Sequence, residues 1–181
     1  FLGNIKVHEV NHHLAHAASA YYNSGFDETN AIVFDGQGEE ATISLYKING
    51  NNFQTISQSY WPHSLGMLYL KSTEQLGYKL GDEYKVMGMS AFGKDSFSEI
   101  FVNSTEINEQ GRFYFKSNKY ITFEDLPHTS HNTLKFTHNI DKILSKPTNY
   151  NFKQKHFDFA KSLQTKIENI GLELSNFLYE K

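Results

Sequence analysis

Two histidines near the start of the chain stand four positions apart. His12 and His16 lie in the segment NHHLAHAA, which predicts the beginning of a helix. Because positions i and i+4 lie one above the other on the same helical face, both imidazoles can point at one ion. The spacing therefore predicts a metal site.

An acidic, glycine-rich turn follows and offers a third ligand. Residues 31–34 predict a buried strand, and Asp35 stands at its end. Two imidazoles and one carboxylate leave coordination positions open for water or a substrate oxygen, which favours catalysis over a structural ion. The glycines of the turn would also let backbone N–H groups approach a phosphate. After Asp35 the turn contains Gly36, Gln37, Gly38 and Glu39.

Simpler interpretations of the same residues remain open. In zinc-protease helices the residue after the first histidine is a glutamate that acts as general base, and here that residue is His13, so the protease hypothesis fails. We expect His13 to lie beside the metal or to face a substrate. The imidazoles could instead form hydrogen bonds within a helix, and the glycine-rich segment could be an ordinary tight turn.

Residues 81–93 form a second candidate segment. It combines charge, glycine and methionine too irregularly for a simple amphipathic helix face. Lys85 offers a cation for a phosphate or carboxyl oxygen, and Gly88 permits close approach of a ligand or a second backbone. The alternative is a solvated turn.

Strands and helices alternate in the predicted secondary structure. The expected strands are 6–10, 31–34, a hairpin of 41–48 and 53–60 around an Asn-Gly turn, and a small hairpin of 112–115 and 119–123. The expected helices are the histidine segment, which ends at 23–25, then 63–77, 82–91 and a final helix over 160–177. The last helix carries one apolar stripe, which we interpret as core.

These elements predict an α/β fold with a mixed sheet and flanking helices. We expect residues 1–181 to form a single partial domain, with a less regular insertion over 94–151. The chain begins at Phe1 rather than Met, which suggests a piece of a longer protein.

Composition narrows the class of protein. The chain has 181 residues, of which 39% are hydrophobic, enough for one domain with a real core, and no apolar run approaches the length of a membrane span. A net charge of −3 with dispersed lysines argues against nucleic acid as a partner, and we expect no membrane partner. The chain contains no cysteine, which excludes disulfides and thiolate ligands and fits a cytoplasmic location.

Four ordered motifs resemble the O-carbamoyltransferases of the nodulation-protein and antibiotic-tailoring type, in the actin-like, ribonuclease H-like ATPase superfamily. The matching stretches are 12–26, 35–39, 62–69 and 82–93, and residues 160–164 resemble the start of the following helix of that family. One departure is Met89-Ser90-Ala91-Phe92-Gly93 where the family has Leu-Ala-Pro-Tyr-Gly.

The resemblance implies a two-step reaction on small molecules. Carbamoyl phosphate and ATP would give a carbamoyl-adenylate, whose carbamoyl group passes to a hydroxyl of a sugar or other small acceptor. His12, His16 and Asp35 would hold a divalent metal, with iron favoured. Gly36, Gln37, Gly38 and Glu39 would lie near the nucleotide phosphates or the carbamoyl group. Lys85 would face the same site, and Lys85 and His13 are the candidate catalytic residues.

The resemblance also implies that other parts of the catalytic machinery belong to the remaining lobe of a longer parent chain. We therefore expect this chain by itself to be inactive. Two alternatives stay open: a protein like the tRNA threonylcarbamoyl transferases, which share the histidine pair, and a non-catalytic metal- or nucleotide-binding module. The sequence identifies neither the acceptor nor the oligomeric state.

Overall fold

The computed structural model describes residues 6–125 and 132–181. These residues form six helices and seven strands, and the strands pair into three antiparallel sheets. The predicted α/β class is confirmed, and the arrangement is consistent with an incomplete lobe of the actin-like ATPase type. The parallel strands that would make the sheet mixed are not among the described residues.

The largest sheet contains β1 (Glu28–Gly38), β2 (Ala41–Asn49) and β3 (Asn52–Tyr60) in that order. The predicted hairpin of the second and third strands is confirmed. Its turn passes through Gly50 at a φ of 56°, a backbone conformation that glycine adopts without steric cost.

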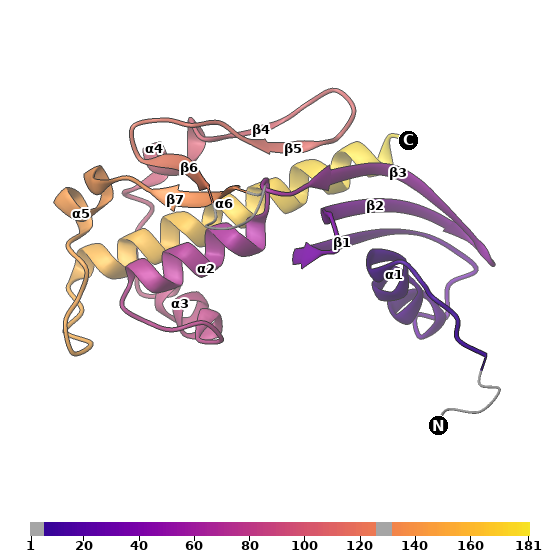
Figure 1. Ribbon diagram of the computed structural model, residues 1–181, viewed down its shortest axis with the longest axis horizontal. Helices are drawn as coiled ribbons and strands as arrows, with labels where there is room; N and C mark the ends of the chain where they lie inside the picture. Colours follow the sequence, from indigo (N-terminus) through magenta and orange to yellow (C-terminus); the bar gives the residue numbers. More distant parts are fainter. Residues whose placement is uncertain (1–5, 126–131) are drawn as a thin grey trace.

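Helix α1 (His12–Tyr22) covers one face of this sheet (Figure 1). Side chains alternate between the two faces along each strand, so a small core forms under α1 from Ala17, Tyr21, Val33, Tyr46 and Ile48. The same alternation places Asp35, two residues after Val33, on the face toward α1. The opposite face joins the main core through Ile43 and Leu45.

The main core lies between α2 (Leu65–Gln75), α3 (Glu83–Ser90) and α6 (Gln154–Tyr179). The predicted helices are confirmed, and α6, with 26 residues, is longer than its apolar stripe indicated. Figure 1 shows α6 running along the long axis of the molecule, from beside α5 to beside β3. Its buried face includes Phe159, Leu163, Ile170, Leu174 and Leu178.

Short elements fill the region between α3 and α6. They are α4 (Ser98–Val102), β4 (Thr105–Ile107), β5 (Phe113–Phe115), β6 (Ile121–Asp125), β7 (Asn132–Phe136) and α5 (His138–Leu144). The predicted hairpin of 112–115 with 119–123 is wrong: both segments contain strands, but β5 pairs with β4 and β6 pairs with β7. A turn at Gly111, with a φ of 72°, joins β4 to β5 instead.

The predicted strand over residues 6–10 is also wrong. These residues carry no regular structure, and Val7 and Val10 are 78% and 61% exposed. A strand needs a partner for its backbone groups, and none of the described strands pairs with this segment.

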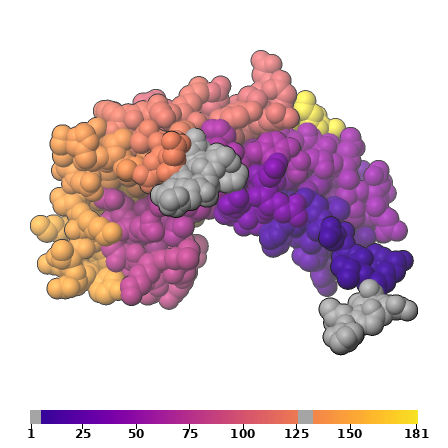
Figure 2. Space-filling model, viewed as in Figure 1, coloured from indigo at the N-terminus to yellow at the C-terminus, as the bar shows by residue number. Residues whose placement is uncertain are grey.

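The molecule has an arched outline, with a concave edge between α3 and α1 (Figure 2). No helix in the described ranges combines the length and the apolar composition that crossing a membrane requires.

Candidate metal centre

The start of α1 is attached to the glycine-rich segment of residues 35–39. The sequence predicts a turn here, but residues 35–38 form the irregular end of β1 and only Glu39 lies beyond the strand. The Asn11 side chain caps the helix, since its Oδ1 accepts a hydrogen bond from the Leu14 N–H at 3.0 Å. Its Nδ2 donates to Glu39 Oε2, also at 3.0 Å. One side chain thus fixes the helix start and connects it to the glycine-rich turn.

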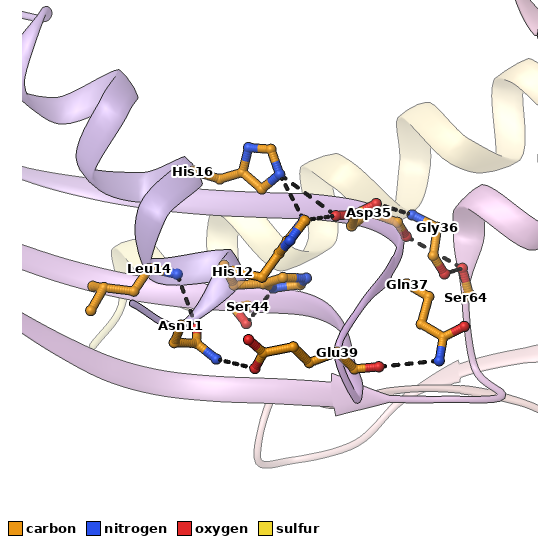
Figure 3. Close-up of polar contacts among 11 residues, drawn as sticks. Asn11, His12, Leu14, His16, Asp35, Gly36, Gln37, Glu39, Ser44 and Ser64 are labelled. Carbon is orange, nitrogen blue, oxygen red and sulfur yellow. Dashed lines mark hydrogen bonds and ion pairs between the residues drawn. The ribbon is translucent and has the colours of Figure 1, made fainter. Parts of the chain in front are cut away.

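His12, His16 and Asp35 converge at one point (Figure 3). His12 Nε2 lies 2.7 Å from Asp35 Oδ2 and 3.0 Å from His16 Nε2, and 3.6 Å separates His16 Nε2 from Asp35 Oδ2. The three side chains are part-exposed, at 44%, 56% and 26%. The predicted ligand set is therefore brought together, on a surface that solvent and small molecules can reach.

The donor set fits a divalent transition metal. Ligand atoms that are each about 2.0–2.2 Å from one ion lie roughly 3 Å from each other, close to the distances between these three atoms. Two imidazoles and one carboxylate suit Fe²⁺ and leave coordination positions open. Burial pushes the pKa of Asp35 upward, but hydrogen bonds from His12 and the Gly36 N–H outweigh it and hold the pKa below its usual value. The carboxylate is thus ready to bind a cation.

The N-terminus of α2 holds the turn that carries Asp35. The Ser64 hydroxyl, which caps α2, donates to the Gly36 carbonyl at 2.6 Å. Gly66 lies directly against the same turn, where an added Cβ would come within 2.7 Å of the Gly36 Cα. Sequence reasoning missed both roles. The Ser64 cap signals a helix start, but nothing local to it identifies the distant turn as its partner.

The four residues predicted near the nucleotide already make contacts within the protein. The Gly36 N–H donates to Asp35 Oδ1 at 2.6 Å, and Gln37 Nε2 donates to the Glu39 carbonyl at 3.1 Å. Gly38 lies under the histidine rings, where an added Cβ would come within 2.4 Å of His13 Cδ2. Two of these contacts lie within the segment and the third joins it to α1. The part of the four residues in nucleotide binding stays a prediction.

A cavity of about 620 Å³ adjoins the turn. Its walls are mostly apolar and come from β1, α2, the segment before α3, α3 and α6; they include Phe34, Gly36, Gln37, Leu65, Met67, Leu80, Glu83 and Ile167. Gly36 and Gln37 follow Asp35 directly, so the cavity and the histidine cluster share the turn.

The two predicted catalytic residues lie in different surroundings. His13 is fully buried and its Nδ1 lies 2.7 Å from Ser44 Oγ, so it faces the sheet rather than a substrate. Burial also lowers its pKa, although the charge of Asp35 opposes the shift. Lys85 pairs with Asp82 at 2.7 Å on α3, and the structure does not bring it into contact with the histidine cluster.

Comparison with known proteins shows which sequences this chain resembles. An uncharacterized protein of Synechocystis sp. is 33% identical over 94% of this chain and 27% of its own length. Nodulation protein NolNO of Sinorhizobium fredii is 34% identical over 60% of this chain and 16% of its own length. Nodulation protein NolO of Bradyrhizobium diazoefficiens is 32% identical over 58% and 19%. The chain therefore spans less than a third of the length of these relatives.

The sequence model of one family, described as carbamoyltransferase N-terminus, matches residues 3–181. The match includes α1, β1 and α3, which carry all the predicted site residues except Glu39, and Glu39 directly follows β1. The chain thus belongs to the carbamoyltransferase N-terminus family.

Proposed function

We propose that this chain is the metal-binding part of a carbamoyltransferase that consumes ATP and carbamoyl phosphate and transfers the carbamoyl group to a hydroxyl. The observation that carries the proposal is the convergence of His12, His16 and Asp35 within a chain of this family. Two nodulation proteins are among its relatives, which agrees with the nodulation type of the resemblance, and that resemblance implies a sugar or other small hydroxyl compound as the acceptor.

His12, His16 and Asp35 would hold the metal, with Fe²⁺ favoured by the two-histidine, one-carboxylate set. A bound divalent ion there would supply Lewis-acid polarisation of phosphoryl or carbamoyl oxygens. The protein's own contribution is orientation: Asn11 and Ser64 fix the two ends of the glycine-rich turn relative to α1 and α2.

The proposed reaction has two steps. ATP, carbamoyl phosphate and one water give carbamoyl-adenylate, phosphate and pyrophosphate. The acceptor oxygen then bonds to the carbamoyl carbon, the bond from that carbon to the AMP oxygen breaks, and the hydroxyl proton is released. In this scheme Gly36 to Glu39 lie beside the phosphates, and Lys85 supplies positive charge once the rest of the site is assembled.

The remaining lobe of the protein would complete the site. An apolar cavity of about 620 Å³ that opens beside the metal ligands supports this, because apolar surface of this kind is normally covered. The relatives are more than three times as long as this chain, which leaves ample sequence for a second lobe. The absence of cysteine fits a reducing compartment, and we propose a cytoplasmic location.

The test is AMP formation by the full protein that carries this domain, with Fe²⁺, ATP, carbamoyl phosphate and a panel of sugars. We expect AMP release that requires carbamoyl phosphate, and a loss of at least about 100-fold in Asp35→Asn, which removes a charged ligand. AMP release that ignores carbamoyl phosphate would contradict the proposal. Salt-sensitive retention of tRNA by the protein would instead favour the threonylcarbamoyl alternative.

A further inference from the structure

The histidine between the two metal ligands is the most deeply buried polar group near the site. His13 has no exposed surface, whereas His12 and His16 on the same helix are part-exposed. A buried imidazole is costly unless its polar atoms are paired. Of its two ring nitrogens, Nδ1 has a hydrogen-bond partner and the buried Nε2 has none among the described residues, so the bond made by Nδ1 is the polar contact that holds the ring.

His13 is connected across the interface to two strands. Its Nδ1 lies 2.7 Å from Ser44 Oγ on β2, and Gln58 Nε2 on β3 donates to the same oxygen at 3.0 Å. With Gln58 donating to it, the Ser44 hydroxyl has its own proton free to donate to Nδ1. Ser44 is itself fully buried, so the chain of hydrogen bonds runs through a dry interface between α1 and the sheet.

The opposite side of the ring has no spare room. A Cβ added at Gly38 would lie 2.6 Å from His13 Nε2 and 2.6 Å from His12 Cδ2. The ring therefore lies between the Ser44 hydroxyl on β2 and the backbone of Gly38 on β1, which carries no side chain. A rotation of α1 about its axis would break the bond to Ser44 or drive a ring into Gly38.

Rotation of α1 would also move the proposed metal ligands on this helix. Each residue advances a helix by about 100°, so His12 and His16 both lie on one side of His13 and turn with it. Their contacts with Asp35, at 2.7 Å and 3.6 Å, depend on that angle.

From these contacts we propose that His13 is a positioning residue: its buried bond to Ser44, against Gly38, sets the rotation of α1 and holds His12 and His16 at the distances from Asp35 that bind a metal. The inference rests on the metal site of the proposed function. In this proposal Gly38 has a second role besides its predicted position near the nucleotide: without a side chain, it leaves room for the histidine rings.

The test is Co²⁺ binding by the full protein that carries this domain, measured for the wild type, Ser44→Ala and Tyr21→Phe. Co²⁺ is the probe because its visible absorption reports the ligand geometry. We expect Ser44→Ala to weaken Co²⁺ binding about tenfold and to change the spectrum, as loss of a supporting hydrogen bond does at other metal sites. Tyr21→Phe loses a bond to the Asp27 carbonyl at the other end of α1 and should leave the Kd within about twofold.

A merely structural bond would lower the thermal midpoint in both variants and leave both Kd values unchanged, and this result would overturn the assignment. A second comparison uses His13→Phe, which removes the same bond while keeping a buried ring. Adding Ser44→Ala to it should cause no further loss of Co²⁺ affinity, and a further loss would also overturn the assignment. If the wild type binds no Co²⁺, the proposed metal site itself is wrong. If Ser44→Ala binds Co²⁺ as the wild type does, only the proposed role of His13 is wrong.

Discussion

Glycines at the candidate metal centre act by making room for neighbouring groups. Gly38 leaves space for the rings of His12 and His13, and Gly66 lets the N-terminus of α2 lie on the backbone of Gly36. Neither has a left-handed backbone that would itself require glycine. The requirement at both positions is therefore steric, and it can be tested by adding one methyl group.

We predict that Gly66→Ala destabilises the protein and weakens metal binding. Alanine normally stabilises a helix by up to about 1 kcal/mol relative to glycine, but this Cβ would lie 2.7 Å from the Gly36 Cα and 2.9 Å from its nitrogen. Backbone cannot rotate away as a side chain can, so we expect a net cost of about 1–3 kcal/mol. Urea unfolding measures the cost, and a Co²⁺ titration measures the displacement of Asp35.

Gly171→Ala is the matched control, because Gly171 is also helical and a Cβ there would meet no atom within 4 Å. It should stabilise the protein by up to about 1 kcal/mol. If the two variants proved equally stable, the steric account of Gly66 would be wrong.

At this scale the sequence predicted which three side chains come together but not the residues that support them. Helical spacing brings His12 to His16, and Asp35 lies beside them near the end of β1, whereas their role as metal ligands stays a prediction. Ser44, Ser64 and Gly66 act through contacts with residues 28 or more positions away, which no local pattern contains. His13 is predicted to lie beside the metal or to face a substrate, and its contact with Ser44 on β2 is likewise one that no local pattern contains.

At the scale of elements, local signals identified helices well and strand partners poorly. The α2 and α6 segments carry caps or apolar stripes that are visible within a few turns. The sequence predicts strands at β5 and β6, but each pairs with a segment, β4 or β7, for which it predicts no strand. Pairing is decided by packing in the whole fold, which single-sequence patterns do not report.

The link between β3 and α2 contains a titratable contact. His63 Nδ1 accepts the Phe115 N–H at 3.1 Å, and the ring packs against Tyr114 and Phe123. Burial lowers the pKa of His63 below its ordinary value of 6.5. Protonation would also remove the lone pair that accepts from Phe115. Only the neutral ring can therefore make the bond that connects the link after β3 to β5.

We predict that this contact makes stability fall in mild acid. The unfolded chain protonates His63 first, near pH 6.5, so stability is fully present above that pH and is lost as the pH falls toward the lower pKa of the folded state. The loss is at most about 1.4 kcal/mol per pH unit. Urea midpoints at pH 7.5 and 5.5 measure it.

His63→Asn is the control, because an amide can accept the same N–H without titrating. The variant should lose less stability than the wild type between these two pH values. Equal losses would show that other groups cause the acid sensitivity.

At the scale of the whole molecule, two cores of unequal size lie on opposite faces of the large sheet. The main core joins the helices from α2 to α6 with β2, whereas the core under α1 contains five buried side chains. The proposed metal ligands are divided across the smaller interface: α1 carries two and β1 carries the third. The weaker interface is therefore the one that a bound metal would bridge.

We predict that α1 opens more readily than α6 and that metal suppresses this opening selectively. Amide hydrogen exchange should be faster in α1 than along the buried face of α6, because local opening follows the amount of apolar surface that holds an element. Co²⁺ at about 100 times its Kd should slow exchange in α1 by up to about 100-fold, since a ligand that binds only the closed form stabilises it by RT ln(1 + [L]/Kd).

The α6 amides provide an internal control, because their exchange does not require the ligands to separate. In His16→Ala the α1 amides should no longer respond to Co²⁺. Equal slowing in both helices would mean that the ion stabilises the fold as a unit, and α1 would then be no weaker than the rest.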